Sequence, residues 1–315
     1  MTDVVCLGIL VADAIAQPVD DLPPRGALEL VDEISLHGGG CALNTASVLV
    51  RLGLASAVVG KVGVDPFGDF ILQLLDERGV DRRGVMQDQG VSTSATVVLV
   101  DSGGERTFLH LPGANGRVRL EELEEEEEEE VLFGGRALHV AGALVMPELD
   151  GGPTAAILTR AKARGLTTSL DTVWDATGRW ERLLPSLPHL DLFVPSLAEG
   201  SAITGQPKPE SVAAWLRERG VGTVALKLGA DGCFVASEEF EGYVAAPAVT
   251  AIDGTGSGDA FAAGLLYGHL AGWPLERAAA LGNAAGALAS TAVGAVEGVR
   301  GLQETLALAG LESVA

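Results

Sequence analysis

The sequence predicts an α/β fold in which a doubly wound, mostly parallel sheet carries helices on both faces. Short apolar runs typical of buried parallel strands alternate with helical patterns along the 315 residues. Hydrophobic residues make up 47% of the chain, which is enough for a core of this size. Because parallel strands need a crossover between them, the alternation indicates βαβ units with a ligand crevice at the carboxyl ends of the strands.

Apolar runs provide the predicted central strands. Each run is between four and eight residues long, as expected for a strand that is covered on both faces. They span residues 4–10, 57–62, 137–141, 166–170, 190–194 and 223–228.

Helix start and stop signals punctuate the intervals between these runs. Asp65 and Pro66 supply an N-cap and a first helical residue, and Gly79 follows as the stop. Pro209 opens a second helix, and residues 154–165 form a third.

Two segments break the alternation and predict β-ribbons. Residues 94–111 read as strands 95–100 and 106–111 joined by a Ser-Gly-Gly turn, and residues 18–36 contain turn residues without a helical pattern. No helix in sequence covers their apolar faces, so we expect the two segments to pair as a small β-sheet lid over the crevice. The prediction is a single domain over 1–315 with lid segments at about 15–37 and 91–114.

The charge balance narrows the choice of partners. A formal net charge of −22 argues against nucleic acid and against an anionic membrane surface, which both require a basic face. Residues 121–130 contain nine Glu, and without them the charge is still −22 + 9 = −13. This run predicts a solvated linker or an exposed helix face, with a cation-binding segment as the alternative.

Missing sequence signals predict the cellular compartment and the state of the cysteines. No run approaches the roughly 18 apolar residues of a membrane span, and the first residues carry no basic signal region, so we expect a cytoplasmic protein. Cys6, Cys41 and Cys233 are odd in number and widely spaced, which predicts buried or half-buried thiols and neither disulfides nor a zinc site.

The strongest chemical motif is DGTGSGD at residues 253–259, directly before a helical stretch. Alternate glycines let successive backbone N–H groups point into one spot, and a helix start adds the positive end of its dipole. An aspartate in that first turn, Asp259, lies within reach of a hydroxyl about to attack a bound phosphate. The loop therefore predicts an anion cradle with a general base, although an ordinary capped Gly-rich loop has the same pattern.

Three motifs together resemble the PfkB, or ribokinase-like, family of carbohydrate kinases. They are GGCALN at 39–44, VGVDPFG at 62–68 and DGTGSGD at 253–259, and the resemblance spans essentially the whole chain. It implies a ribokinase-like fold and ATP-dependent phosphoryl transfer to a hydroxyl of a sugar or nucleoside. The family's last motif is usually D-T-x-G-A-G-D, so Gly254 and Ser257 depart from it while staying small.

The resemblance also implies roles for residues on the acceptor side. Asp259 is similar to the catalytic base, and the backbone N–H groups of Gly256, Ser257 and Gly258 are similar to the anion hole. Asp13 matches a ligand of substrate hydroxyls, Gly39 and Gly40 match the lid hinge, and Asn44 matches a substrate ligand. From pattern alone, Asp13 is equally a turn residue and Asn44 a helix N-cap.

On the nucleotide side, the resemblance implies contacts from Lys227, Gly229, Gly232 and Asn283, the last near adenine. By pattern alone, a polar residue in an Ala-rich helix such as Asn283 is usually exposed. The family's N-x-x-E motif appears as Ser196-Leu197-Ala198-Glu199, which keeps Glu199 for Mg²⁺ but lacks the Asn. Asp253 is the candidate for ordering a monovalent cation, as in some relatives.

The sequence therefore predicts an ATP- and Mg²⁺-dependent kinase for a small sugar, with a homodimer through the lid as a further expectation. A nucleoside kinase of the same fold and a non-catalytic sugar- or nucleotide-binding relative are the alternatives. A dinucleotide-binding oxidoreductase is a remote one, because G-x-G-x-G-D near the C-terminus does not match G-x-G-x-x-G.

Overall fold

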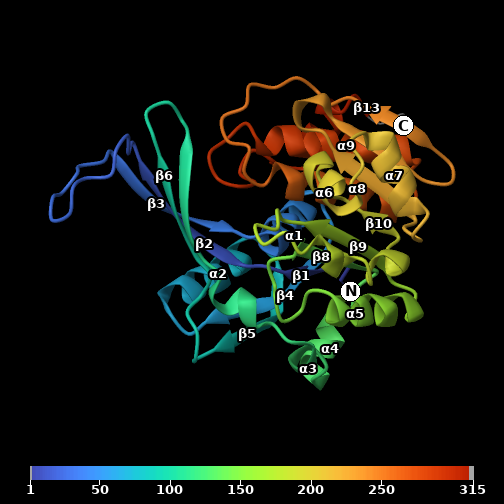
Figure 1. Cartoon of the computed structure of the whole chain (residues 1–315), viewed down its shortest axis with the longest axis horizontal. Helices are drawn as coiled ribbons and strands as arrows, with labels where there is room; N and C mark the ends of the chain where they lie inside the picture. The colour runs from blue at the N-terminus through green and yellow to red at the C-terminus, as the bar shows by residue number, and fades with distance from the viewer. Residues whose placement is uncertain (1, 312–315) are drawn as a thin grey trace.

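A computed structural model of the chain describes residues 2–311, so the first residue and the last four of the predicted domain lie outside the described part. The described residues form a nine-stranded main sheet with a smaller sheet standing beside it (Figure 1). Across the main sheet the order is β13 (Glu241–Val244), β12 (Cys233–Ala236), β11 (Thr223–Lys227), β10 (Leu192–Phe193), β9 (Thr167–Thr172), β8 (Ala137–Ala143), β1 (Val4–Gly8), β4 (Ser56–Gly63) and β5 (Asp81–Asp88). From β11 to β5 every pairing is parallel, and β12 and β13 are antiparallel.

Helices cover both faces of this sheet, as predicted, and each face has its own apolar core. One face carries α1 (Cys41–Arg51), α2 (Pro66–Glu77), α8 (Ser257–Leu270), α9 (Leu275–Ala289) and α10 (Leu302–Leu308). The other carries α3 (Leu120–Leu123), α4 (Glu126–Leu132), α5 (Gly152–Ala163), α6 (Leu197–Thr204) and α7 (Pro209–Arg217). Short 3₁₀ turns lie at η1 (Gly113–Arg117), η2 (Trp180–Leu183), η3 (Leu187–His189) and η4 (Gly229–Asp231).

The predicted helix signals are confirmed at residue level. The Asp65 side chain accepts a hydrogen bond from the backbone of Gly68 at 2.9 Å, Pro66 is the first helical residue of α2, and Gly79 turns the chain at φ +70°. The Glu run forms α3 and α4, and most of its side chains are exposed. The exposed-helix interpretation of this run is therefore correct.

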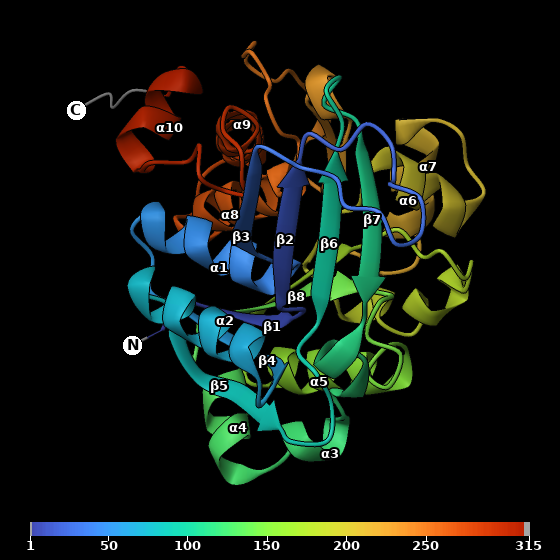
Figure 2. The same ribbon diagram turned by 90° about the vertical axis from the view of Figure 1, so that its left-hand side faces the viewer.

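A four-stranded lid sheet has the order β3 (Glu33–Gly39), β2 (Val11–Gln17), β6 (Ala95–Val100) and β7 (Arg106–Leu111) (Figure 2). The predicted hairpin over 94–111 is confirmed, but the ribbon predicted over 18–36 is wrong in its bounds. Residues 18–32 are mostly irregular, and strands lie on either side of them. The sequence does not predict strand β2, because its alternate residues are alanines, which have low strand propensity. Residues 18–32 do not form a strand, because the prolines at 18, 23 and 24 have no N–H to donate to a neighbouring strand.

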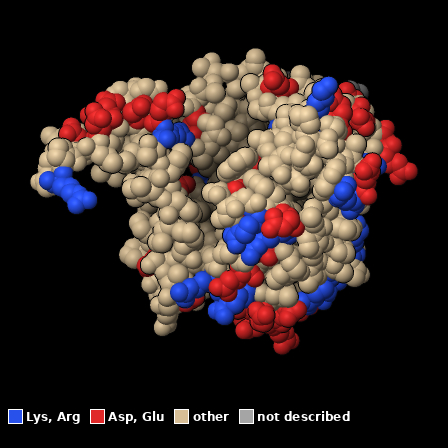
Figure 3. Space-filling model, in the orientation of Figure 1, with Lys and Arg blue, Asp and Glu red and all other residues tan. Residues whose placement is uncertain are grey.

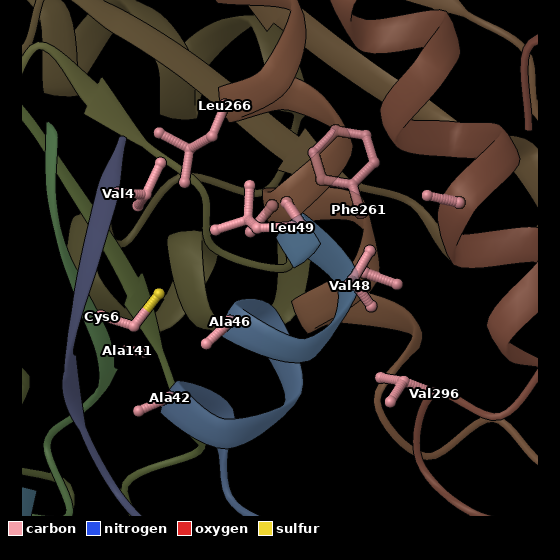
Figure 4. Close-up of a cluster of buried hydrophobic side chains, with 14 of the residues drawn as sticks. Val4, Cys6, Ala42, Ala46, Val48, Leu49, Ala141, Phe261, Leu266 and Val296 are labelled. Atoms are coloured by element: carbon pink, nitrogen blue, oxygen red, sulfur yellow. The ribbon is translucent and has the colours of Figure 1, made fainter. Parts of the chain in front are cut away.

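Packing of α1 against β1 and α8 positions the residues of the site. Ala42 and Ala46 face Cys6 of β1, while Leu49 lies toward Phe261 and Leu266 of α8 (Figure 4). Small side chains on one side of α1 let its backbone approach the sheet closely, so the first turn of α1 is held opposite the first turn of α8.

The burial of the cysteines and the length of the helices agree with the sequence. Cys6 and Cys233 are buried, Cys41 is half-buried, and all are free thiols, as predicted. Within residues 2–311, every helix is too short or too polar to cross a membrane.

Candidate active site

A cavity of about 240 Å³ lies between the lid and the carboxyl edge of the main sheet. In the space-filling view this face of the molecule is hollowed between the lid and the larger body (Figure 3). The cavity brings together predicted residues from distant parts of the chain, namely Asp13, Gly40, Asn44, Gly256 and Asp259. Asp253, the candidate for ordering a monovalent cation, also lines it. The other predicted site residues are not among the lining residues, namely Gly39, Glu199, Lys227, Gly229, Gly232, Ser257, Gly258 and Asn283.

The Gly-rich loop before α8 has the geometry of an anion cradle. Gly256 takes a left-handed φ of +74°, and a Cβ there would lie 1.9 Å from the carbonyl oxygen of Ala295, so only glycine fits. Helix α8 begins at Ser257, which leaves the first N–H groups of the helix without intrahelical acceptors. The Ser257 N–H donates to the carbonyl of Gly254 at 3.3 Å, whereas the N–H groups of Gly256 and Gly258 have no acceptor within residues 2–311.

Asp259 is a buried carboxylate at the floor of the cavity. Asn44 donates a hydrogen bond from Nδ2 to Oδ2 of Asp259 at 2.8 Å. Burial raises the pKa of Asp259, and the Asn44 hydrogen bond and the Lys227 charge offset only part of that rise. A carboxylate with a raised pKa is a stronger proton acceptor, which suits it to take a proton from a hydroxyl.

Asn44 lies inside α1, whose N-cap is Gly40, so the N-cap interpretation of Asn44 is wrong. Its Oδ1 is buried and has no hydrogen-bond partner among the described residues. Since an unpaired buried acceptor is costly, this oxygen is suited to a hydroxyl of a bound molecule.

Asp13 lies on β2 of the lid rather than in a turn, so the turn interpretation is wrong as well. Burial raises the pKa of Asp13, while the Thr96 hydroxyl and the nearby His110 and His37 lower it. The two histidines thus lie beside a candidate substrate ligand, and His37 lines the cavity.

Gly39 is the last residue of β3 and Gly40 is the N-cap of α1, where the lid joins the body. A Cβ on Gly39 would lie 2.1 Å from Oδ2 of Asp13, and one on Gly40 would lie 2.4 Å from the carbonyl oxygen of Ile9. Only Gly40 needs a positive φ, of +90°. Gly39 is therefore required for the space that it leaves to Asp13, not for its backbone angles.

We expect Gly39→Val to raise KM for the acceptor and to lower kcat, each by about tenfold or more, because ångström-scale displacement of a positioning group is costly. Steady-state kinetics with the acceptor as the varied substrate measures both effects. Gly152→Ala on α5 is the matched control, since a Cβ there meets no atom within 4 Å. Wild-type kinetics in a folded Gly39→Val protein would contradict the role of this glycine.

Lys227 at the end of β11 lies beneath the anion cradle. Its Nζ contacts both carboxylate oxygens of Asp171 at 2.7 Å, and a Cβ on Gly258 would lie only 3.1 Å from Nζ. Burial alone lowers the pKa of Lys227, but the charges of Asp171 and Glu199 outweigh it and raise the pKa, so the ammonium stays charged. A fixed positive charge is thereby held beside the cradle.

Glu199 lies in the first turn of α6 and forms a capping box with Ser196. Its Oε2 accepts hydrogen bonds from the backbone N–H and the hydroxyl of Ser196, both at 2.7 Å. Ser-x-x-Glu at the start of a helix is the sequence signature of a capping box. This capping role explains the serine at position 196, where the family usually has Asn.

The donor set fits Mg²⁺ brought in with phosphates. Within residues 2–311 no group of at least three His, Cys, Asp or Glu side chains is arranged to hold a metal alone. Mg²⁺ bound to nucleotide phosphates needs only one or two protein carboxylates. Glu199 is the candidate for one of them, and the hydrogen bonds from Ser196 engage its Oε2.

Comparison with known proteins agrees with this geometry. The family model described as "pfkB family carbohydrate kinase" matches residues 1–300. A fructokinase of Klebsiella pneumoniae is 35% identical over 90% of this chain and 94% of its own length, and a 2-dehydro-3-deoxygluconokinase of Bacillus subtilis is 30% identical over 87% of each. A solved Arabidopsis thaliana ribokinase complexed with ribose and ATP superposes with a TM-score of 0.87 at 23% identity, over 98% of this chain and 99% of that one.

The chain belongs to the PfkB family of carbohydrate kinases. Its fold is the ribokinase-like fold, and it is an ATP-dependent carbohydrate kinase.

In this kinase Gly229, Gly232 and Asn283, three of the residues expected to contact the nucleotide, do not line the cavity. Gly229 and Gly232 have left-handed φ values of +64° and +95° at the turn after β11. Asn283 is buried in α9, not exposed, and its Nδ2 donates to the carbonyl oxygens of Val244 at 2.8 Å and Ala245 at 3.3 Å. Asn283 therefore anchors the chain after β13, and its place near adenine stays a prediction.

Arg106, which lines the cavity, and Asp171, which pairs with Lys227, are candidate site residues that the sequence analysis does not single out. Each carried a usable signal. Arg106 shares the alternation of β7 with Phe108, so both face the cavity, and Asp171 is an acid at the carboxyl end of a buried apolar run.

Proposed function

We propose that this kinase transfers the γ-phosphoryl group of ATP to a hydroxyl of a small non-ribose sugar or sugar derivative. The observation that carries the proposal is the hydrogen bond from Asn44 to Asp259 beside the open N–H groups of the cradle. It supports the proposal because a candidate base, a candidate acceptor ligand and a candidate anion site then lie at one cavity.

In the proposed reaction, Asp259 accepts the proton of the acceptor hydroxyl, and the hydroxyl oxygen forms a bond to the γ-phosphorus. The bond from that phosphorus to the β,γ-bridging oxygen breaks, and ADP leaves with the electron pair. The N–H groups of Gly256 and Gly258, with the ammonium of Lys227 beside them, stabilise the charge on the transferred group. When bound, Mg²⁺ neutralises charge on the phosphates, and Glu199 is the candidate to hold it.

Cavity size and lining support a small acceptor. About 240 Å³ is below the roughly 300–1,000 Å³ of pockets for drug-sized ligands. Asp13 and the free oxygen of Asn44 suit vicinal hydroxyls, since both accept hydrogen bonds. At the end of β8, where ribokinases carry a glutamate, this chain has Gly142, which offers no carboxylate to ribose.

A nucleoside is the second candidate acceptor, because Phe108 of the lid lines the cavity and could stack on a base. Phe108 is the single phenyl ring in the lining, which also includes the imidazole of His37 and aliphatic side chains such as Ile15 and Val98. This lining therefore ranks a nucleoside below a sugar.

The test is a panel of ketoses, ketohexose phosphates, sugar acids, ribose and nucleosides, assayed for ADP release with ATP and Mg²⁺. We expect the highest kcat/KM with a non-ribose sugar. Preference for adenosine, guanosine or inosine would replace the sugar by a nucleoside. ADP release no higher than the acceptor-free background throughout would favour a non-catalytic binding protein.

We also propose that a second copy of the chain covers the outer face of the lid. The residues that alternate with the cavity-facing ones include Ile34, Val97 and Leu109, which are 74%, 42% and 62% exposed. Such a broad apolar face is unusual on a monomer. Sedimentation velocity at micromolar concentration tests the dimer, and a single monomeric species would contradict it.

A further inference from the structure

Asp253, the first residue of the cradle loop, is a buried carboxylate whose oxygens are already occupied by donors. Its side chain is 1% exposed. Oδ1 accepts from Nη1 of Arg106 at 2.5 Å and from the N–H of Thr255 at 2.8 Å, and Oδ2 accepts from the N–H of Gly294 at 3.2 Å. A buried carboxylate needs a partner of opposite charge, and here the guanidinium is that partner.

The charge state follows from the same contacts. Burial by itself raises the pKa of Asp253, but the hydrogen bonds from Arg106 and from Thr255 outweigh it, and the net pKa lies below the ordinary 3.8. The carboxylate of Asp253 is therefore ionised at neutral pH and faces the guanidinium of Arg106.

These contacts do not fit a monovalent cation at Asp253. Such an ion needs several oxygen atoms free to coordinate it, yet Nη1 of Arg106 lies 2.5 Å from both Oδ1 of Asp253 and Oγ1 of Thr255. A metal ion on those oxygens would be repelled by the guanidinium. Asp253 is therefore not the cation ligand that the sequence led us to expect.

We infer that the guanidinium of Arg106 takes the place of a monovalent cation at Asp253 and orders the cradle loop from the lid. Arg106 begins β7 of the lid, whereas Asp253 and Thr255 belong to the loop that leads into α8. All three residues line the acceptor cavity. One side chain thus supplies the charge that neutralises Asp253 and ties the lid to the loop that presents the anion-hole N–H groups. Arg106 is a positioning residue, and this role rests on the proposed function of the cradle.

The first experiment compares phosphoryl transfer in KCl, in NaCl and in choline chloride at the same ionic strength. For the wild type we expect rates within about twofold of one another. For Arg106→Gln we expect kcat to fall by about tenfold or more, as for loss of a charge-assisted hydrogen bond, with partial recovery on adding K⁺ or methylguanidinium. Several-fold stimulation of the wild type by K⁺, or a wild-type kcat in Arg106→Gln, would overturn the inference.

Arg83→Gln is the matched control, because Arg83 is an exposed arginine of β5 that pairs locally with Asp81. A second readout uses the nucleotide-free protein. Amide hydrogen exchange of Thr255 and Gly294, which donate to Asp253, should be faster by about tenfold in Arg106→Gln and unchanged in Arg83→Gln.

This exchange measurement separates the inference from the proposed function. Failure of the wild type to phosphorylate any acceptor would contradict the function and leave the exchange comparison to decide the role of Arg106. Wild-type exchange at Thr255 and Gly294 in Arg106→Gln would contradict the inference even in an active kinase.

Discussion

Asp259→Asn should lower kcat by at least about a hundredfold, the usual contribution of a general base, while ATP binding survives. The amide removes the proton acceptor, but the cradle N–H groups and Lys227 stay in place. Coupled ADP detection measures kcat, and calorimetric titration measures the Kd of ATP. Retention of half of the wild-type kcat would exclude Asp259 as the base.

The same substitution should stabilise the fold at neutral pH. Because burial raises the pKa of Asp259, the native state binds this proton more tightly than the unfolded chain does. The contribution of this carboxyl to the free energy of unfolding therefore falls as pH rises from the ordinary 3.8 through the raised pKa. We expect Asp259→Asn to have a Tm at or above that of the wild type at pH 7, with the difference shrinking toward acid pH.

Asp76→Asn on α2 is the matched control for both measurements, since this carboxylate is exposed and pairs with Arg82 alone among the described residues. It should leave kcat and the Tm at pH 7 near their wild-type values. A lower Tm for Asp259→Asn at pH 7 would mean that the carboxylate stabilises the fold, contrary to the effect of its burial.

Asp13→Ala should lower kcat/KM for the preferred acceptor by roughly a hundredfold, as for a buried charge-assisted hydrogen bond worth about 2–3 kcal/mol. The structure adds a physical reason, because the missing Cβ of Gly39 leaves room for this carboxylate and His37 and His110 lie near it. KM for ATP should stay near its wild-type value, since Asp13 lies on the lid strand β2, away from the turn after β11.

Steady-state kinetics with each substrate varied in turn checks this prediction. Asp76→Ala serves as the exposed-carboxylate control. An Asp13→Ala enzyme with wild-type kcat/KM would remove Asp13 from the acceptor site, and a rise confined to KM for ATP would move it to the nucleotide side.

Local sequence was enough for features that depend on neighbouring residues. The cap at Asp65, the hairpin over 94–111 and the exposed Glu run are all set within a few residues, so pattern predicted them. The glycine spacing before α8 likewise predicted a cradle, because Gly256 is restricted by its own φ.

Tertiary structure alone decided which distant groups meet. Asn44 and Asp259 are 215 residues apart, and nothing in either segment shows that one side chain donates to the other. Arg106 reaches Asp253 across 147 residues, which turned an expected cation ligand into half of an ion pair. Burial, which raises the pKa of Asp259 and pairs Lys227 with Asp171, depends on how α1, α8 and the carboxyl edge of the sheet pack together. The charge state and the hydrogen-bond partners of a site residue depend on this packing. The residue types that can act at the site are determined by the sequence.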